Sequence, residues 1–139
     1  MELSLANGKT GCFRPFQDTD FARIQILNRT EGWTNLANDD KTTFNAWNNS
    51  NVRFVVCAED DVVGYIRGLT DKHVTLYICE LLIERGFRGM GIGSELLHYV
   101  HRIYPNTRME LLASQSSFRY YEQNRFRNFP GFRKTLLEY

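Results

Sequence analysis

The chain has 139 residues, of which 42% are hydrophobic, 14% aromatic and 24% charged. This composition excludes a disordered chain and predicts a single globular domain over residues 1–139. The formal net charge is only +1 and the longest apolar run falls short of the roughly 18 residues of a membrane span, so we expect neither a nucleic-acid nor a membrane partner. Without a signal peptide or a CxxC pair among its three cysteines, the chain is expected in the reducing cytoplasm, with no zinc site and no disulfide framework.

The first half of the chain predicts one strand and two helices after a loose lead-in. Gly11–Pro15 is expected to form a strand that ends at its proline, because proline has no N–H for a sheet. A helix capped by Asp18 or Thr19 follows, and a weaker helix is predicted over about Asp39–Trp47. The expected apolar face of the first helix consists of Phe21, Ile24, Ile26 and Leu27.

The second half predicts a meander of strands and then an alternation of helices and strands. The meander consists of Val52–Ala58, Val62–Gly68 and Val74–Ile83, joined by tight turns. The later elements are a helix over about Gly91–Tyr104, a strand Arg108–Ala113, a short helix Ser116–Asn124 and a final strand Arg133–Tyr139. A right-handed crossover makes the strand at 108 parallel to the one that ends at 83. The predicted fold class is therefore mixed α/β, with helices on both faces of a mixed sheet.

The stretch Leu81–Ser94 passes from an apolar strand through three glycines into an amphipathic helix. Glycine at 89, 91 and 93 removes Cβ atoms where a ligand approaches the main chain, and the start of a helix offers unpaired N–H groups to phosphate oxygens. Arg88 adds a positive charge and a planar set of donors. We predict a diphosphate site here. The alternatives are helix–strand packing without a ligand for the glycines and a surface ion pair with Glu84 for Arg88.

The context of these glycines argues against two common nucleotide-binding motifs. A Walker loop carries lysine and then Ser or Thr after its last glycine, whereas Gly93 is followed by Ser94 and Glu95. A dinucleotide-binding unit usually stands near the start of its domain, whereas this segment lies mid-chain after an antiparallel meander. A different phosphate-containing ligand is therefore expected.

The segment Arg88–Gly93 resembles the (Gln/Arg)-x-x-Gly-x-(Gly/Ala) signature of GNAT-type N-acetyltransferases. Leu81–Ile83 resembles the strand that precedes this signature, and Arg14-Pro15 followed by Asp20 resembles the opening of the family. The order of elements matches over nearly the whole chain. The resemblance implies a GNAT-like three-layer fold, in which a mostly antiparallel central sheet contains one parallel, splayed pair of strands.

The resemblance also implies acetyl-CoA as co-substrate and no metal. The diphosphate of this cofactor would bind the main-chain amides of residues 89 to 94, and its pantetheine arm would pair like a strand with Leu81 and Ile83. The expected cofactor-binding residues are Leu81, Leu82, Ile83, Arg88, Gly89, Met90, Gly91, Ile92, Gly93, Ser94 and Ser114. A main-chain N–H near Leu82 is the expected donor to the developing oxyanion.

Tyr121 is the candidate acid for the leaving thiolate, since the family carries a tyrosine five residues before a phenylalanine, here Phe126. A phenol has a pKa near ~10, close to that of a thiol, so the proton transfer is not steeply uphill. The alternative is a packing aromatic. Arg125 stands where the family has glycine, and Asn124 is expected to take the left-handed position in its place.

Glu80 is the candidate base that accepts a proton from the amine through a water molecule, because several relatives carry an acid at this place. The alternative is a solvated strand carboxylate. Trp33 and Asn35 lie in the region that caps the acceptor pocket in relatives, and core packing is the alternative for Trp33. His98 and His101 stand three residues apart but without a third ligand, so a metal site is not predicted.

The predicted function is N-acetyl transfer from acetyl-CoA to a primary amine by direct attack in a ternary complex. The acceptor, either a small molecule or a peptide amine, stays open, and so does a homodimer. The alternatives are a CoA-binding regulatory module without turnover and an acetyltransferase of protein amines.

Overall fold

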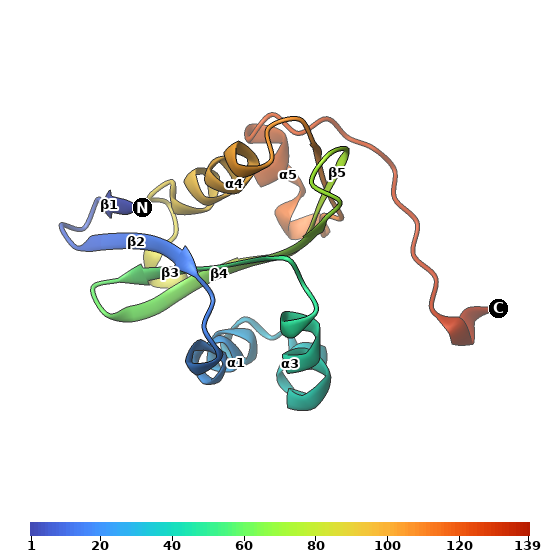
Figure 1. The fold of residues 1–139 in the computed structure, drawn as a ribbon, viewed down its shortest axis with the longest axis horizontal. Coiled ribbons are helices and arrows are strands. Elements are labelled where there is room, and N and C mark those ends of the chain that lie inside the picture. Colours follow the sequence, from blue (N-terminus) through green and yellow to red (C-terminus); the bar gives the residue numbers. More distant parts are fainter.

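The computed structural model describes residues 1–139 as one six-stranded sheet with helices on both faces (Figure 1). The strands are β1 (Glu2–Ser4), β2 (Thr10–Pro15), β3 (Val52–Ala58), β4 (Asp61–Thr70), β5 (Thr75–Ile83) and β6 (Arg108–Leu111). They lie side by side in chain order, and all neighbours are antiparallel except β5 and β6, which are parallel. The predicted mixed sheet with its parallel pair is confirmed.

The helices form the two outer layers of the fold. They are α1 (Phe21–Glu31), α2 (Thr34–Ala37), α3 (Asp40–Asn48), α4 (Ile92–Ile103) and α5 (Gln115–Gln123), with short 3-10 turns η1 (Asp18–Asp20), η2 (Arg85–Phe87) and η3 (Leu136–Glu138). Figure 1 shows α4 and α5 on one face of the sheet and α1 and α3 on the other. None of the helices is both long enough and apolar enough to cross a membrane.

Two hydrophobic clusters join the layers. The larger one packs α4 onto the sheet through buried Leu96, Leu97 and Val100, which recur at helical spacing. The smaller one packs α1 and α3 onto the opposite face and contains Trp47 and Tyr65. Because strand residues alternate between faces, the same strands feed both clusters and the sheet is covered on each side.

Three details of the predicted secondary structure are wrong. The lead-in contains the edge strand β1, whose three residues pair with β2. Neither Asp18 nor Thr19 caps α1, because Gln17 precedes the 3-10 turn that leads into the helix. The final strand expected at Arg133–Tyr139 does not form, and this segment contains only the short turn η3. A strand needs a neighbouring strand, and in this chain that segment lies beside none.

The predicted apolar face of α1 is partly wrong. Ile24 and Leu27 are buried as expected, but Ile26 is 46% exposed, and the polar residues Gln25 and Asn28 are buried instead. The amide nitrogen of Asn28 donates to Gln25 Oε1 at 2.8 Å, and the Tyr65 hydroxyl donates to Asn28 Oδ1 at 2.5 Å. Their polar groups can be buried because each one has a hydrogen-bond partner.

Candidate functional site

The parallel strands β5 and β6 separate at one end and leave part of β5 without a neighbour. Their pairing is confined to Thr75–Ile78 on β5 and Arg108–Leu111 on β6. Beyond it, Leu81–Ile83 still pairs with β4 on one side but with no strand on the other. The result is a V-shaped opening lined by main chain.

The hydrogen-bond alternation of an antiparallel pair decides which β5 groups face this opening. The Glu84 N–H donates to Val63 O at 2.8 Å, so the main-chain groups of Leu82, two residues back, also face β4. The groups of Leu81 and Ile83 therefore face the opening. Consistent with this, Ile83 O points away from β4 and accepts a hydrogen bond from Arg88 Nε at 2.7 Å. Leu81 thus offers its N–H and C=O to a ligand and Ile83 its N–H, whereas the Leu82 groups face β4.

A β-bulge lies just before the open segment. Arg67 pairs with Glu80 and the adjacent Gly68 pairs with Ile78, so Cys79 is the extra residue in β5. The bulge changes which residues point to which face. Ile78 belongs to the α4 side of the sheet, and so do Leu81 and Ile83 three and five residues later. Without the extra residue, strand alternation would send Leu81 to the opposite face.

The glycine turn lies between the end of β5 and the start of α4. Gly89 and Gly91 both have φ of 78°, a left-handed conformation that favours glycine, and a Cβ built on either would meet nothing within 4 Å. Gly91 is the N-cap of α4 and offers no side chain to the first N–H groups of the helix. Open space above bare main chain at a 12-residue helix start fits a diphosphate group.

Gly93 has a different structural reason. A Cβ at this position would collide with the hydroxyl of Tyr120 from α5. Gly93 therefore lets α5 pack close to α4, a helix–helix contact rather than the helix–strand packing that was the predicted alternative. Its main-chain N–H remains part of the first turn of α4, where a phosphate would bind.

Arg88 is engaged with residues of the chain itself. Besides the bond to Ile83 O, its Nη2 lies 2.6 Å from Glu31 Oε2 at the end of α1. The predicted alternative partner, Glu84, pairs instead with Arg23 at 3.1 Å. The Arg88 side chain is 44% exposed, so it is accessible to a phosphate that competes with Glu31.

Tyr121 lies on α5 and packs half-buried against the cluster that also contains Ile83. Its ring makes edge-to-face contacts with Tyr120 and Phe126, at centroid distances of 5.2 and 5.4 Å. Burial, followed by the neighbouring Tyr120, raises the pKa of Tyr121 to about 12. The phenol is therefore a proton carrier that stays protonated well above neutral pH.

Glu80 is not a solvated carboxylate but one half of a largely buried ion pair with Arg67. Arg67 Nε lies 2.7 Å from Glu80 Oε1 and Nη2 lies 2.5 Å from Oε2, and each side chain is only 14% exposed. Burial acts to lower the pKa of Arg67, but the hydrogen bonds to Glu80 outweigh it, and the pKa is raised. Each oxygen of Glu80 thus already accepts a hydrogen bond from an arginine.

The start and end of α5 also differ from expectation. Ser114 is the N-cap residue, and its hydroxyl lies 3.0 Å from those of Ser116 and Ser117, so its polar group serves the helix itself. The prediction that Asn124 adopts the left-handed conformation is wrong, since its φ is −88° and Arg125 has φ of 67°. The Asn124 side chain instead donates to Tyr120 O at 2.9 Å.

The proposed acceptor residues lie at the junction of α1 and α2. Trp33 is half-buried against the cluster that contains Leu82, and Asn35 is exposed. His98 is exposed, whereas His101 Nε2 lies 2.8 Å from Thr107 O at the end of α4. No group of three or more His, Cys, Asp or Glu side chains in the chain is placed to hold a metal ion.

The sequence did not predict the ion-pair partners of two site residues, which are Arg67 for Glu80 and Glu31 for Arg88. A charged residue within the buried, β-rich strand Val62–Gly68 was a signal that its side chain needs an opposite charge nearby. Nothing in the sequence links Glu31 to Arg88, because the two are 57 positions apart and meet only after folding.

Comparison with known proteins gives one family. A model described as the acetyltransferase (GNAT) family matches residues 19–126. No curated protein matches the chain significantly by sequence.

Solved structures resemble the chain over most of its length. A candidate acetyltransferase from Deinococcus radiodurans R1 has a TM-score of 0.72 and 20% identity and covers 91% of this chain and 88% of its own. The aminoglycoside acetyltransferase meta-AAC0020 from an uncultured soil metagenomic sample, solved with sisomicin, has a TM-score of 0.65 and 18% identity. The match covers 91% of this chain and 96% of that protein. Arabidopsis thaliana Naa50, solved with the bisubstrate analogue CoA-Ac-MVNAL, has a TM-score of 0.63 and 20% identity. The match covers 81% of this chain and 80% of that protein. At such identities these likenesses show the fold alone.

Proposed function

Because the chain belongs to the GNAT family of acetyltransferases, we propose that it transfers an acetyl group from acetyl-CoA to a primary amine by direct attack within a ternary complex. The observation that carries this proposal is the open edge of β5 at Leu81–Ile83, directly before the Gly89–Gly91 turn and the start of α4. Main-chain groups on the open side of Leu81–Ile83 and N–H groups at the start of α4 thus suit a ligand with two amides at one end and a diphosphate at the other.

The residues present fit this cofactor at three points. The amide groups of Leu81 and Ile83 would hold its pantetheine arm, the N–H groups at the start of α4 would hold its diphosphate, and Arg88 would add a charge once it leaves Glu31. When bound, acetyl-CoA supplies an activated thioester. Met90, Ile92, Gly93 and Ser94 complete the proposed contact surface of the turn, and Leu82 and Ser114 are weaker members because their polar groups face the protein.

Tyr121 is the proposed proton donor. Its Oη holds a proton at neutral pH because the pKa is raised to about 12, and its helix packs against the sheet face to which Leu81 also belongs. A thiol has a pKa of about 8.5, so complete transfer from this phenol is uphill and a hydrogen bond from it is the main contribution.

Glu80 is proposed as a positioning residue rather than as a free base. Its ion pair with Arg67 crosses from β4 to the bulge of β5 and holds that bulge in place next to the open segment. An amine acceptor would then lose its proton to water, or to Glu80 through a water molecule that competes with Arg67. Glu80→Gln, compared with Arg67→Met, separates these roles. If Glu80 is the base, Glu80→Gln lowers turnover far more than Arg67→Met does, whereas a positioning role predicts similar losses in the two variants.

The proposed acceptor is a small-molecule or peptide amine. The structurally similar meta-AAC0020 was solved with an aminoglycoside, and Naa50 with an analogue that joins CoA to a peptide, so both classes occur on this fold. Trp33 and Asn35 are the proposed acceptor contacts. Trp33 offers an aromatic surface beside the Leu82 side of the sheet, and Asn35 an exposed amide.

One observation favours a regulatory module that binds CoA without turnover. Both oxygens of Glu80, the leading candidate base, already accept hydrogen bonds from Arg67. Thiol release from acetyl-CoA with a panel of aminoglycosides, polyamines and peptides distinguishes the two functions. Release that depends on an amine supports the enzyme, whereas tight CoA binding without release by any amine supports the module.

The site itself is tested by calorimetric titration with CoA on Gly91→Ala. The substitution forces alanine into a left-handed conformation, which costs about 1 kcal/mol, and adds a methyl group at the phosphate contact. We expect at least a tenfold loss of affinity. Gly86→Ala is the matched control, because Gly86 lies in the same turn without a positive φ and with free space around it. Equal affinities for both variants would refute the diphosphate site.

A further inference from the structure

Two of the three cysteines stand directly opposite each other on neighbouring strands. Cys12 on β2 and Cys57 on β3 are Cα partners in the antiparallel register. Both side chains belong to the smaller hydrophobic cluster, beneath α1 and α3, so they point to the same face of the sheet. All three cysteines are free thiols. The fold therefore places two free thiols side by side, although they lie far apart in the sequence.

The hydrogen bonds between β2 and β3 indicate how far apart the two cysteines are. Glu59 N donates to Thr10 O at 2.8 Å, so these two residues form a hydrogen-bonded pair. Because such pairs recur at every second residue, Cys12 and Cys57 form the next one. The Cα atoms of a hydrogen-bonded pair are about 5.5 Å apart, a separation that a disulfide can span. Its Cβ atoms are about 5 Å apart and would have to approach to about 4 Å, so the bond forms under strain and is easily reduced.

The third cysteine, Cys79, has no thiol beside it. It is the extra residue of the bulge in β5, and β4 lies between this strand and β3. Two strand spacings of about 4.8 Å separate β5 from β3 by about 10 Å, and two Cα atoms more than about 7 Å apart cannot be bridged without movement of the backbone. Cys79 is therefore an internal control for a thiol without a neighbour.

The two paired thiols differ in their access to solvent. Cys12 is half-buried, whereas Cys57 is only 4% exposed. An oxidant in solution therefore reaches Cys12 first, and Cys57 reacts with it from inside the protein. Burial raises the pKa of Cys57, and the guanidinium of Arg14 acts against this rise. The positive charge of Arg14 thus favours the Cys57 thiolate that a second reaction step requires.

We propose that Cys12 and Cys57 form a reversible dithiol–disulfide site, which a small disulfide such as glutathione disulfide oxidises. The Cys12 thiol loses its proton, and its thiolate attacks one sulfur of the oxidant to form a mixed disulfide and release a first glutathione. The Cys57 thiol then loses its proton, and its thiolate attacks the Cys12 sulfur to form the internal disulfide and release a second glutathione. Two protein thiols are oxidised, and one disulfide of the oxidant is reduced to two thiols.

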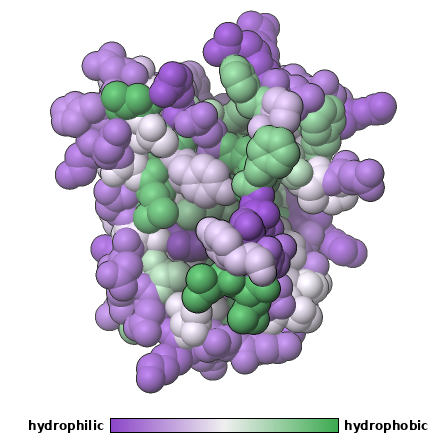
Figure 2. Space-filling model, turned by 90° about the vertical axis from the view of Figure 1, so that its right-hand side faces the viewer, coloured by the Kyte–Doolittle hydropathy of each residue, from purple (hydrophilic) through white to green (hydrophobic).

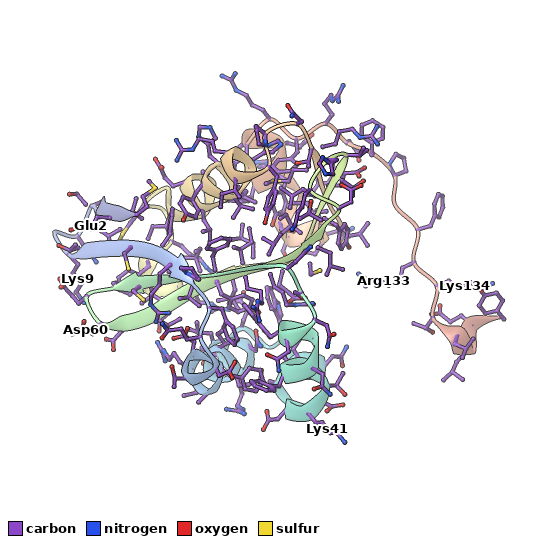
Figure 3. All side chains as sticks on the ribbon, in the orientation of Figure 1. Glu2, Lys9, Lys41, Asp60, Arg133 and Lys134 are labelled. Carbon is purple, nitrogen blue, oxygen red and sulfur yellow. The ribbon has the colours of Figure 1, made fainter.

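The site lies away from the proposed cofactor surface on β5 and α4, so it does not depend on acetyl transfer. Figure 3 shows the labelled Glu2, Lys9 and Asp60 at the same end of the sheet, and Glu2 is the β1 partner of Cys12. Figure 2 shows the opposite end of the molecule, where apolar side chains lie at the surface among polar ones. Contacts between copies through that end would leave the two thiols of each chain facing each other. The expected bond therefore forms within one chain.

The first test counts free thiols and maps the bond after the folded protein has reacted with glutathione disulfide. We expect the count to fall from three thiols to one, while the protein keeps the 16.3 kDa of a single chain on a non-reducing gel. Trypsin separates the three cysteines into the peptides 10–23, 54–67 and 73–85, and the first two should be joined. A wild type that keeps all three thiols, carries only mixed disulfides, or joins the third peptide to another one overturns the proposal.

Single variants test the order of the two steps. Cys57→Ala removes the second thiol, so glutathione should stay on Cys12 as a mixed disulfide that adds to the mass of peptide 10–23. Cys12→Ser removes the accessible thiol, and Cys57 should then react far more slowly than in the wild type. Cys79→Ser is the control and should form the bond at the wild-type rate. If Cys57 reacts as fast in Cys12→Ser as in the wild type, the order is refuted, and circular dichroism shows whether each variant is folded.

The last test is reduction of the isolated disulfide form. Because the bond draws the two strands closer than their normal spacing, we expect reduced glutathione to restore all three thiols. A bond that resists glutathione and opens only with a stronger dithiol would be a permanent structural disulfide, and that result would refute a reversible site.

Discussion

Arg67 holds Glu80 through two hydrogen bonds, from Nε to Oε1 at 2.7 Å and from Nη2 to Oε2 at 2.5 Å. Arg67 Nη1 also lies 3.0 Å from the hydroxyl of Ser50, which in turn donates to Ala46 O. These contacts join β4, the bulge of β5 and the end of α3. The acid expected to act as a base is therefore part of the framework that fixes the open segment of β5.

Glu80→Ala is expected to lower the free energy of unfolding by about 3 kcal/mol, because it leaves the largely buried guanidinium of Arg67 without its counter-charge. The double variant Arg67→Met, Glu80→Leu removes both charges and should recover most of this loss. Urea unfolding followed by tryptophan fluorescence measures both. Additive losses in the double variant would contradict a coupled pair.

The meander, the parallel pair and the glycine turn could be predicted because their signals are local. Val52–Ala58 carries β-branched residues between turns, and Gly89 and Gly91 precede a helix with clear apolar spacing. The partners of charged residues could not be predicted, since Arg67 meets Glu80 only through strand register. The strand predicted at the C-terminus was wrong for a related reason, because a segment with the composition of a strand forms one only beside another strand.

Tyr121→Phe is expected to reduce turnover by about a hundredfold with little change in CoA affinity, since it removes a proton donor and leaves the ring packing intact. The pKa of Tyr121 is raised to about 12, so the donor stays protonated and wild-type turnover should not fall between about pH 8 and about pH 10 through its ionisation. Steady-state rates across this range, with a saturating amine, measure both effects.

Tyr120→Phe is the matched control in the same helix, because Tyr120 lies against Gly93 and is not the proposed donor. It should keep most of the turnover. Equal losses in the two variants would show that α5 packing, and not proton donation, limits the reaction.

The raised pKa of Tyr121 also affects the stability of the fold. The contribution of the neutral Tyr121 phenol is present below about pH 10 and lost as the pH rises toward 12.

Tyr65→Phe is expected to lower the free energy of unfolding by about 2 kcal/mol. The Tyr65 hydroxyl donates to Asn28 Oδ1, and Asn28 is fully buried, so its removal leaves a buried acceptor without a partner. Tyr77→Phe is the control, on a half-buried strand tyrosine whose hydroxyl makes no hydrogen bond within the chain. Thermal and urea unfolding of both variants measure the difference, and equal small losses would mean that water replaces the missing hydroxyl.

Glu31→Gln tests whether Arg88 must break its ion pair with Glu31 before it can bind a phosphate. The variant removes the carboxylate that binds Arg88 at 2.6 Å, so the guanidinium no longer gives up an ion pair when a ligand binds. An exposed pair of this kind is worth up to about 1 kcal/mol, and we expect CoA affinity to rise about threefold. Arg88→Ala should lower it about tenfold, with a weaker dependence on salt, because a charge-assisted hydrogen bond to phosphate is lost.

Arg85→Ala is the control for general charge effects, since Arg85 is an exposed neighbour in the same turn with no ion pair. Its CoA affinity should stay within about twofold of wild type. Calorimetric titrations at low and high salt distinguish the outcomes. If Glu31→Gln weakens binding as strongly as Arg88→Ala does, the ion pair is required to shape the glycine turn, and Arg88 acts by holding Ile83 O rather than by reaching the ligand.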